Sequence, residues 1–193
     1  MKMVKIGIQG GQGSFSEEAA QVFSKKHGID NSEIVYLISS KGVLAGIEAE
    51  DIEFGVFAME NAQGGVVIES VEAMAEYRCR IIEMFHIPVS QNFLSMEGVH
   101  MGDITEIHSH QQALRQCKDY LAEHFWTRPL IESDDTAEAA RRLSQGKLPK
   151  TAAVIGSKYC AELYGLNILD EDIHDLKHNL TLFLGVEKLE ESK

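Results

Sequence analysis

The sequence predicts an α/β protein built from two lobes. Strand and helix patterns alternate in each half of the chain, the alternation stops over residues 78–94, and a short strand at 179–183 closes the sequence. Such alternation is typical of sheets covered by helices. Because little chain follows the closing strand, it must pair with strands from far earlier in the sequence. We therefore expect one lobe at residues 1–85 plus 176–193 and the other at 86–175.

The first half contains three predicted strands, each followed by a helix. A strand at 4–9 runs through a glycine turn into a helix that extends to about residue 26, and Ser14 and Glu17 have the spacing of a capping box at its start. The second strand is 33–38. The third, 54–59, is nearly all apolar, which predicts a central place in a parallel sheet. Loops that follow such strands meet at one edge, where open α/β sheets bind ligands.

The second half repeats this pattern after the extended segment that Pro88 interrupts. A strand at 104–108 leads to a helix that Ser109 and Gln112 open with capping-box spacing. A strand at 129–132 precedes a helix at 137–143, capped by residues 134–136. A strand at 152–155 precedes a helix that begins at Ser157 and ends at Gly165. We place the crossing into the second lobe within 78–94.

Composition limits the classes of function. The chain has 193 residues, 44% hydrophobic and 25% charged, with a net charge of −12. This charge disfavours nucleic acids and anionic membranes, which attract basic surfaces, but a helix N-terminus can still hold a small anion. The three cysteines are far apart, which predicts reduced, buried thiols. There is no signal peptide pattern and no apolar run of about 20 residues, so we expect a cytoplasmic protein.

Several common site motifs are missing. The glycines at 10–13 are not followed by the Lys-Ser/Thr of a phosphate-binding loop, and Ser16 stands where a dinucleotide fingerprint has its third glycine. His108 and His110 have no acidic or thiol partner at ligand spacing. We expect no metal and no cofactor.

Small polar residues instead stand near the predicted strand-to-helix junctions. They are Ser14, Asn61, Ser109 and Thr136. Each by itself reads as a helix N-cap. Together they would line the strand ends of two lobes that face one cleft, and such a site suits a ligand that carries carboxylates.

These motifs, in this order, resemble the catalytic domain of prephenate dehydratase. Residues 10–20 are similar to the opening Gly-Pro-Glu-Gly-Thr-Phe-Ser motif, and Glu60-Asn61-Ala62 to the Glu-Asn-Ser segment. Residues 109–117 are similar to Ser-His-Pro-Gln-Ala-Leu-x-Gln-Cys, residues 136–140 to the Thr-Ala helix start, and residues 179–183 to the closing Asn-x-Thr-Arg-Phe. The resemblance implies a periplasmic-binding-protein-like (type II) fold with the active-site cleft between its lobes.

The resemblance also implies an activity. Prephenate would lose its ring hydroxyl and ring carboxylate together, giving phenylpyruvate, carbon dioxide and water. Thr181 would donate a hydrogen bond to the leaving hydroxyl. The implied substrate-binding residues are Asn61, Ser109, Gln116, Ser14, Thr136 and Glu60, the last with a structural role favoured. A homo-oligomer is implied as well.

The sequence departs from the family pattern at several positions. Leu182 replaces the arginine of Thr-Arg-Phe; the other departures are Gln12, Ala62, Gln91 and Gln111. Ten residues follow Phe183, so we expect no regulatory ACT domain and no phenylalanine control within this chain. On a regular strand Leu182 would point away from Thr181, whereas a bulge would let residue 182 reach the substrate. A decarboxylase acting on prephenate without dehydration and a non-catalytic binder of small carboxylates remain alternatives.

Overall fold

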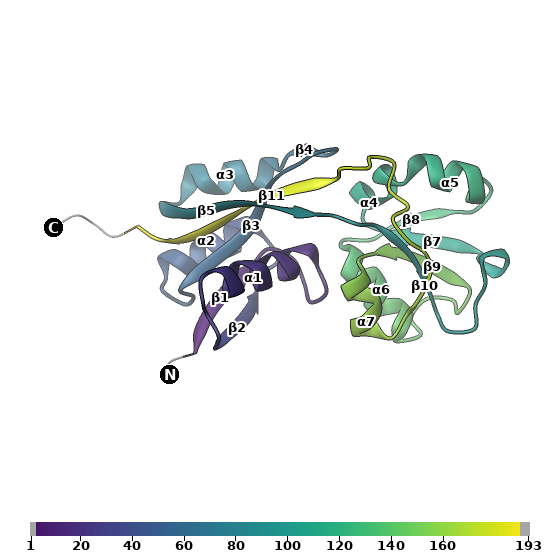
Figure 1. Ribbon diagram of the computed structural model, residues 1–193, viewed down its shortest axis with the longest axis horizontal. Coiled ribbons are helices and arrows are strands. Elements are labelled where there is room, and N and C mark those ends of the chain that lie inside the picture. Colours follow the sequence, from purple (N-terminus) through teal and green to yellow (C-terminus); the bar gives the residue numbers. More distant parts are fainter. Residues whose placement is uncertain (1–2, 190–193) are drawn as a thin grey trace. The chain divides into compact units, whose positions relative to one another are not determined.

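The computed structural model describes residues 3–189, which form two compact units (Figure 1). The first unit contains the described residues up to Pro88 and those from Leu180 onward, and the second contains residues 89–179. The elements of the first unit are β1 (Val4–Ile8), α1 (Phe15–Lys26), β2 (Ser32–Tyr36), α2 (Ser40–Glu48), β3 (Phe54–Asn61), β4 (Gly65–Val66), α3 (Ile68–Glu76), β5 (Cys79–Pro88) and β11 (Leu180–Lys188).

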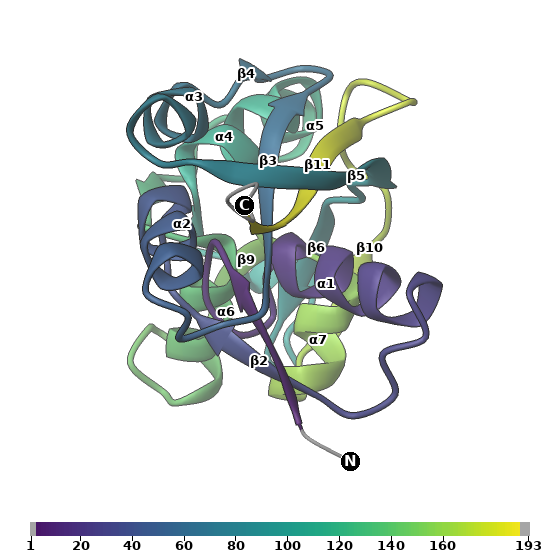
Figure 2. The same cartoon turned by 90° about the vertical axis from the view of Figure 1, so that its left-hand side faces the viewer.

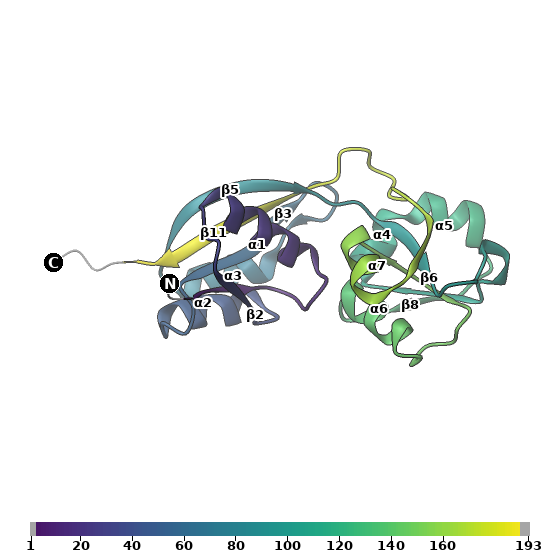
Figure 3. The same ribbon diagram turned by 60° about the horizontal axis from the view of Figure 1, so that its bottom comes forward.

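The sheet of the first unit has the order β2-β1-β3-β11-β5, with β4 paired to β3. The prediction that the third strand is central and that the closing strand returns to the first half is confirmed. β1 pairs in parallel with β2 and β3, but β11 is antiparallel to both of its neighbours, so the prediction of a parallel sheet is wrong for that part. Figure 3 shows β11 lying alongside β5, which precedes it by about 90 residues of chain.

Helices cover both faces of this sheet (Figure 2). On one face, Phe23 of α1 packs with Ile8 and Phe183. On the other face, Leu44 of α2 and Ala73 of α3 pack with Leu184. Successive residues of a strand point to opposite faces, so β11 supplies apolar side chains to both cores. This alternation also decides which face of β11 carries Thr181.

The second unit has its own sheet, in the order β10-β6-β9-β7-β8. β7 is parallel to β8 and β9, whereas β6 is antiparallel to β9 and β10. The elements are β6 (Asn92–Ser95), the 3-10 helix η1 (Met101–Asp103), β7 (Glu106–Ser109), α4 (Gln111–Gln116), α5 (Lys118–Phe125), β8 (Leu130–Glu132), α6 (Thr136–Ser144), β9 (Ala152–Gly156), α7 (Lys158–Tyr164) and β10 (Asn167–Asp170).

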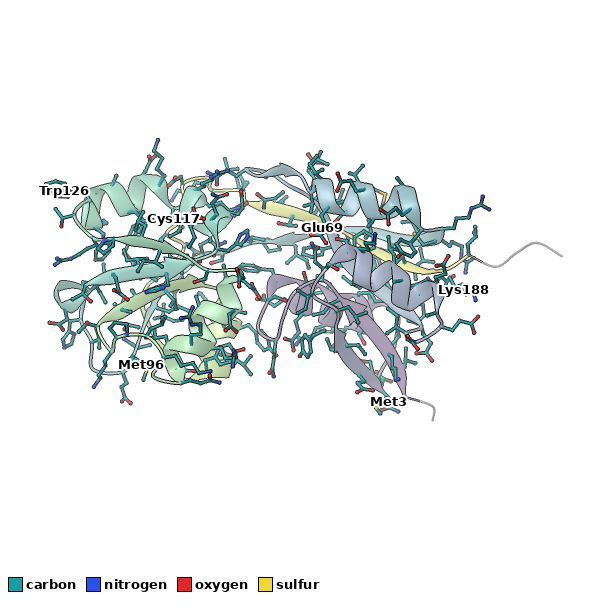
Figure 4. The ribbon with its side chains drawn as sticks, turned by 180° about the vertical axis from the view of Figure 1, so that it is seen from behind. Met3, Glu69, Met96, Cys117, Trp126 and Lys188 are labelled. Atoms are coloured by element: carbon teal, nitrogen blue, oxygen red, sulfur yellow. The ribbon has the colours of Figure 1, made fainter. Side chains whose placement is uncertain are left out.

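Helices again cover both sheet faces of this unit. Residues of α4 and α5 pack with Phe93 and Ile107, and residues of α6 and α7 pack with Leu94 and Val154. The helix predicted from Ser109 is divided at Cys117, whose φ of −114° and ψ of 25° interrupt it. Cys117 joins α4 to α5, and Figure 4 shows Trp126 pointing away from the ribbon; Trp126 is 81% exposed. No helix within residues 3–189 is long and apolar enough to cross a membrane.

The chain enters the second unit at Val89 and leaves it at Asn179, and these two residues are hydrogen bonded to each other. The Val89 amide donates to the Asn179 carbonyl at 2.7 Å, and Asn179 Nδ2 donates to the Val89 carbonyl at 3.2 Å. Asn179 is 3% exposed. A buried side chain that binds the opposite segment in this way fixes the two crossing segments against each other.

Candidate active site

Thr181 and Asn61 face each other on adjacent strands of the first unit. They are register partners in the antiparallel pairing of β11 with β3. Asn61 Nδ2 donates to Thr181 Oγ1 at 2.8 Å, and Thr181 is 6% exposed. Directly opposite residues of antiparallel strands share a sheet face, so this contact follows from the register. A motif at 61 and a motif at 181 thus meet through sheet pairing alone.

The orientation of the Asn61 amide is fixed by the turn that follows it. Its Oδ1 accepts hydrogen bonds from the backbone amides of Gln63 at 3.0 Å and Gly64 at 2.8 Å. The oxygen therefore faces the turn and the nitrogen faces Thr181. Since an amide nitrogen only donates, Thr181 Oγ1 accepts in this bond and its own O–H proton is not used in it.

Leu182 lies on the opposite face of β11 from Thr181. The register with β5 runs without a shift from Leu180 to Gly185, and the bulge near Leu182 is in β3, between Ala58 and Glu60. The regular alternation therefore holds at this point of β11. Leu182 pairs with Glu60 on one side and with His86 on the other, both exposed. Glu60 accordingly shares the face of Leu182, away from Thr181.

Ser14 stands at the start of α1 without making a capping hydrogen bond. It is the N-cap residue, yet its side chain makes no cap hydrogen bond. In the predicted capping box the Glu17 side chain would accept from the Ser14 amide. Glu17 Oε2 instead accepts from the amide of the preceding residue, Gly13, at 2.7 Å. Ser14 is 7% exposed, and its Oγ is a buried polar atom that no other described residue pairs. A hydroxyl at a helix N-terminus in this state suits an anionic ligand.

Three buried amide side chains form a network in the second unit. Gln116 Oε1 accepts from Gln91 Nε2 at 3.0 Å and from Asn179 Nδ2 at 3.1 Å. Gln116 is 2% and Gln91 3% exposed. Because both bonds enter the Gln116 oxygen, its amide nitrogen points away from Gln91 and Asn179, as a donor.

Ser109 and Thr136 do not have the capping roles expected of them. The N-cap of α4 is His110, whose Nδ1 accepts from the Gln112 amide, so the capping box expected from Ser109 is wrong. The buried Ser109 hydroxyl donates to the Ile155 carbonyl at 2.9 Å. The N-cap of α6 is Asp135, and the Thr136 hydroxyl donates to the Asp135 carboxylate at 3.3 Å. In this arrangement the Ser109 and Thr136 hydroxyls both donate their hydrogen bonds to groups of the protein.

The sequence interpretation missed two members of the amide network as site candidates. Gln91 stood out only as a departure from the family pattern, and Asn179 only as the first residue of the closing motif. Spacing gives no signal here, because residues 91, 116 and 179 meet through tertiary structure alone. The sequence does not show that these three amide side chains are buried in the same unit; the structure does.

Burial disfavours the thiolate form of two of the three cysteines. Burial raises the pKa of the Cys117 thiol, and the Asp175 charge adds to this effect. Burial likewise raises the pKa of Cys79. All three cysteines are free thiols; Cys117 and Cys160 are buried as predicted, whereas Cys79 is only partly buried. Within residues 3–189 no group of three His, Cys, Asp or Glu side chains is arranged to hold a metal ion.

Comparison with known proteins identifies the family. The family model for prephenate dehydratase matches residues 6–191. The chain is 34% identical over 182 residues to arogenate dehydratase/prephenate dehydratase 1 of Arabidopsis thaliana, covering 94% of this chain and 44% of the relative. It is 32% identical over 179 residues to the prephenate dehydratase of Methanocaldococcus jannaschii, covering 92% and 62%. The chain thus spans about half the length of the curated relatives it matches.

Solved structures agree with the fold. The prephenate dehydratase of Arthrobacter aurescens in complex with L-Phe superposes with a TM-score of 0.87 at 26% identity, over 97% of this chain and 61% of that one. A periplasmic substrate-binding protein of an ABC transporter from Coxiella burnetii gives a TM-score of 0.51 at 12% identity, over 94% and 84%. The α/β fold is therefore the predicted periplasmic-binding-protein-like type II fold, and the chain belongs to the prephenate dehydratase family.

Proposed function

We propose that this protein is a prephenate dehydratase, which converts prephenate to phenylpyruvate with loss of water and carbon dioxide. The observation that carries the proposal is the hydrogen bond from Asn61 Nδ2 to Thr181 Oγ1. It leaves the buried Thr181 hydroxyl oriented as a donor, as protonation of a leaving hydroxyl requires. Family membership and the retained Asn61 and Thr181 support the same reaction.

The reaction makes modest demands on the protein. Loss of carbon dioxide and hydroxide gives an aromatic ring, so the products are strongly favoured. The protein has to hold the substrate and supply a proton, or a strong hydrogen bond, to the departing oxygen. A threonine hydroxyl is a weak acid, but in a dry site its hydrogen bond strengthens as negative charge grows on the leaving group. The Asn61 donor stabilises any charge that passes to Thr181 Oγ1.

Substrate carboxylates require donors, and we assign these as follows. The Ser14 hydroxyl and the amides at the start of α1 suit one carboxylate, since the residue is buried and its hydroxyl proton is not committed to a described partner. Gln116 is the residue of the second unit that we assign to substrate binding, and Gln91 and Asn179 hold its side-chain oxygen in place. Ser109 and Thr136 contribute as acceptors or by fixing their helices, and Glu60 has a structural role on the far face of β3.

One assay separates this function from its alternatives. The purified protein is incubated with prephenate, and substrate loss and products are followed by ultraviolet absorbance and mass. Phenylpyruvate formation that Thr181→Ala abolishes supports the proposal. A decarboxylated product that keeps its hydroxyl would identify a prephenate decarboxylase, and saturable binding without turnover would identify a carboxylate-binding protein. Arogenate is tested in parallel, because several relatives are named arogenate dehydratases.

We further propose that the protein is cytoplasmic and forms a homo-oligomer. Free thiols at all three cysteines suit a reducing compartment. Fractionation of cells and light scattering of the purified protein test these two statements.

A further inference from the structure

The orientation of the amide network in the second unit can be traced from one backbone atom. The Val89 carbonyl accepts from Asn179 Nδ2, which places the nitrogen of that side chain on the side of Val89 and Gln116. Gln116 must then present its oxygen to Asn179. The same oxygen faces Gln91, so Gln91 must present its nitrogen. Inverting any one amide would set two oxygens or two nitrogens against each other.

This chain of constraints leaves the Gln91 oxygen facing away from Gln116. Gln91 Oε1 is buried and has no hydrogen-bond partner among residues 3–189, whereas the other polar atoms of Gln91 are paired. Its backbone amide donates to His174 Nδ1 at 3.4 Å, and its carbonyl accepts from the Ile173 amide at 2.9 Å. A buried acceptor without a donor is costly and rare in proteins, so its position calls for a donor from outside the chain.

We propose that Gln91 contacts the bound ligand and that its Oε1 accepts a hydrogen bond from a neutral hydroxyl group. The three side chains of the network are uncharged amides, and a buried ammonium group would need a compensating charge that they do not supply. A hydroxyl has no such requirement. Gln91 is thus a specificity-determining residue that selects hydroxylated ligands.

The identity of that hydroxyl rests on the proposed function. The two carboxylates and the keto group of prephenate only accept hydrogen bonds at neutral pH, so its ring hydroxyl is its one neutral donor. Phenylpyruvate, the product, has lost this hydroxyl. Gln91 therefore favours the substrate over the product, because only the substrate can pair the buried oxygen.

Three unreactive ligands test the inference independently of turnover. 4-Hydroxyphenylpyruvate carries the hydroxyl, 4-methoxyphenylpyruvate keeps the oxygen without the proton, and phenylpyruvate lacks both. Calorimetry on the wild-type protein is expected to show the hydroxyl compound binding about tenfold more tightly than either analogue. Because one analogue is larger and the other smaller, size cannot produce this order.

The variant Gln91→Met keeps the length of the side chain and removes the acceptor. We expect it to reduce the preference to about twofold or less. Gln145→Met is the matched control, since Gln145 is exposed at the end of α6 in the same unit, and it should leave the tenfold preference unchanged. Equal binding of the three ligands to the wild-type protein, or an unchanged preference in Gln91→Met, would overturn the proposal. The wild-type comparison decides even if Gln91→Met does not fold. Failure to turn over prephenate would refute the proposed function alone.

Discussion

Asn61 donates a hydrogen bond to Thr181, and the direction of that bond is set by the turn after β3. Gln63 and Gly64 hold the Asn61 oxygen, so only the nitrogen can face Thr181 Oγ1, at 2.8 Å. The two residues are 120 positions apart in sequence and meet because β11 lies beside β3.

Removing the Thr181 hydroxyl should abolish most of the activity. Thr181→Val keeps the shape of the side chain, and we expect kcat for prephenate to fall by about 10²–10³-fold, the usual loss for a donor to a developing charge. Thr181→Ser keeps the hydroxyl and should stay within about tenfold of the wild type. Stopped assays of phenylpyruvate measure both. A Thr181→Val protein as active as Thr181→Ser would show that the hydroxyl is not the donor.

Reversing the Asn61–Thr181 bond should be almost as harmful as removing the hydroxyl. Asn61→Asp can still accept from the amides of Gln63 and Gly64, but its second oxygen would draw the Thr181 proton toward itself. We expect kcat to fall about a hundredfold while the melting temperature changes little. Circular dichroism reports the melting temperature. Wild-type kcat in Asn61→Asp would mean that the direction of the bond is irrelevant.

Restoring the family arginine at 182 should affect stability more than catalysis. Residue 182 shares its sheet face with Glu60 and His86, and an arginine there would form an exposed pair with Glu60 worth about 0–1 kcal/mol. We expect kcat/KM of Leu182→Arg to stay within about threefold of the wild type. Glu60→Gln in the same background should remove any gain in stability. A tenfold rise in kcat/KM would show instead that residue 182 reaches the substrate.

Acid should weaken the attachment of α1 to β5. Burial by itself would raise the pKa of Glu83, but hydrogen bonds and charges from Lys26 and His27 outweigh it and lower the pKa; His27 Nε2 lies 2.6 Å from the carboxylate. In the unfolded chain the pKa of a glutamate carboxyl is about 4.3. The stabilisation is therefore present above that pH and is lost as pH falls through the lower folded pKa.

Melting temperatures from pH 3 to 7 test this assignment. Glu83→Gln should be less stable than the wild type at pH 6, and the difference should shrink toward pH 3. Glu97→Gln, an exposed position in the second unit, serves as control and should follow the wild type. A difference that stays constant with pH would exclude the carboxylate as its cause. Circular dichroism is the suitable probe, since the single tryptophan, Trp126, is 81% exposed and reports poorly on the core.

A methyl group at Gly185 should disturb the core of the first unit. A Cβ there would lie 2.5 Å from Cε2 and 2.8 Å from Cδ2 of Phe23, which is fully buried. We expect Gly185→Ala to lose about 1–3 kcal/mol of stability, because a packed ring has little room to move. Gly102→Ala, where the new Cβ has no neighbour within 4 Å, should change stability by less than about 0.5 kcal/mol. Urea unfolding measures both, and equal stabilities would contradict the packing assignment.

Local patterns predicted most of the helices and strands. The apolar strand at 54–59, the Gly165 helix end and the return of the closing strand to the first half all follow from side-chain periodicity, glycine conformation and chain length. The helix division at Cys117 and the strand β10 did not follow, because tertiary packing overrides local preference there. The N-cap of α4 is His110, one residue beyond the expected Ser109, since neighbouring polar residues can cap a helix equally well, whereas the N-cap of α6, Asp135, lies within the predicted cap at 134–136.

The sequence by itself determined the fold class, the family and the identity of Thr181 and Asn61 as candidates, because these depend on residue type and order along the chain. Only the tertiary structure decided which atoms meet. The continuous register of β11 with β5 placed Leu182 away from Thr181, where the sequence left both possibilities open. The tertiary structure also brought Gln91, Gln116 and Asn179 together and fixed the direction of their hydrogen bonds. Register and burial are set by contacts between distant segments, and no local pattern records them.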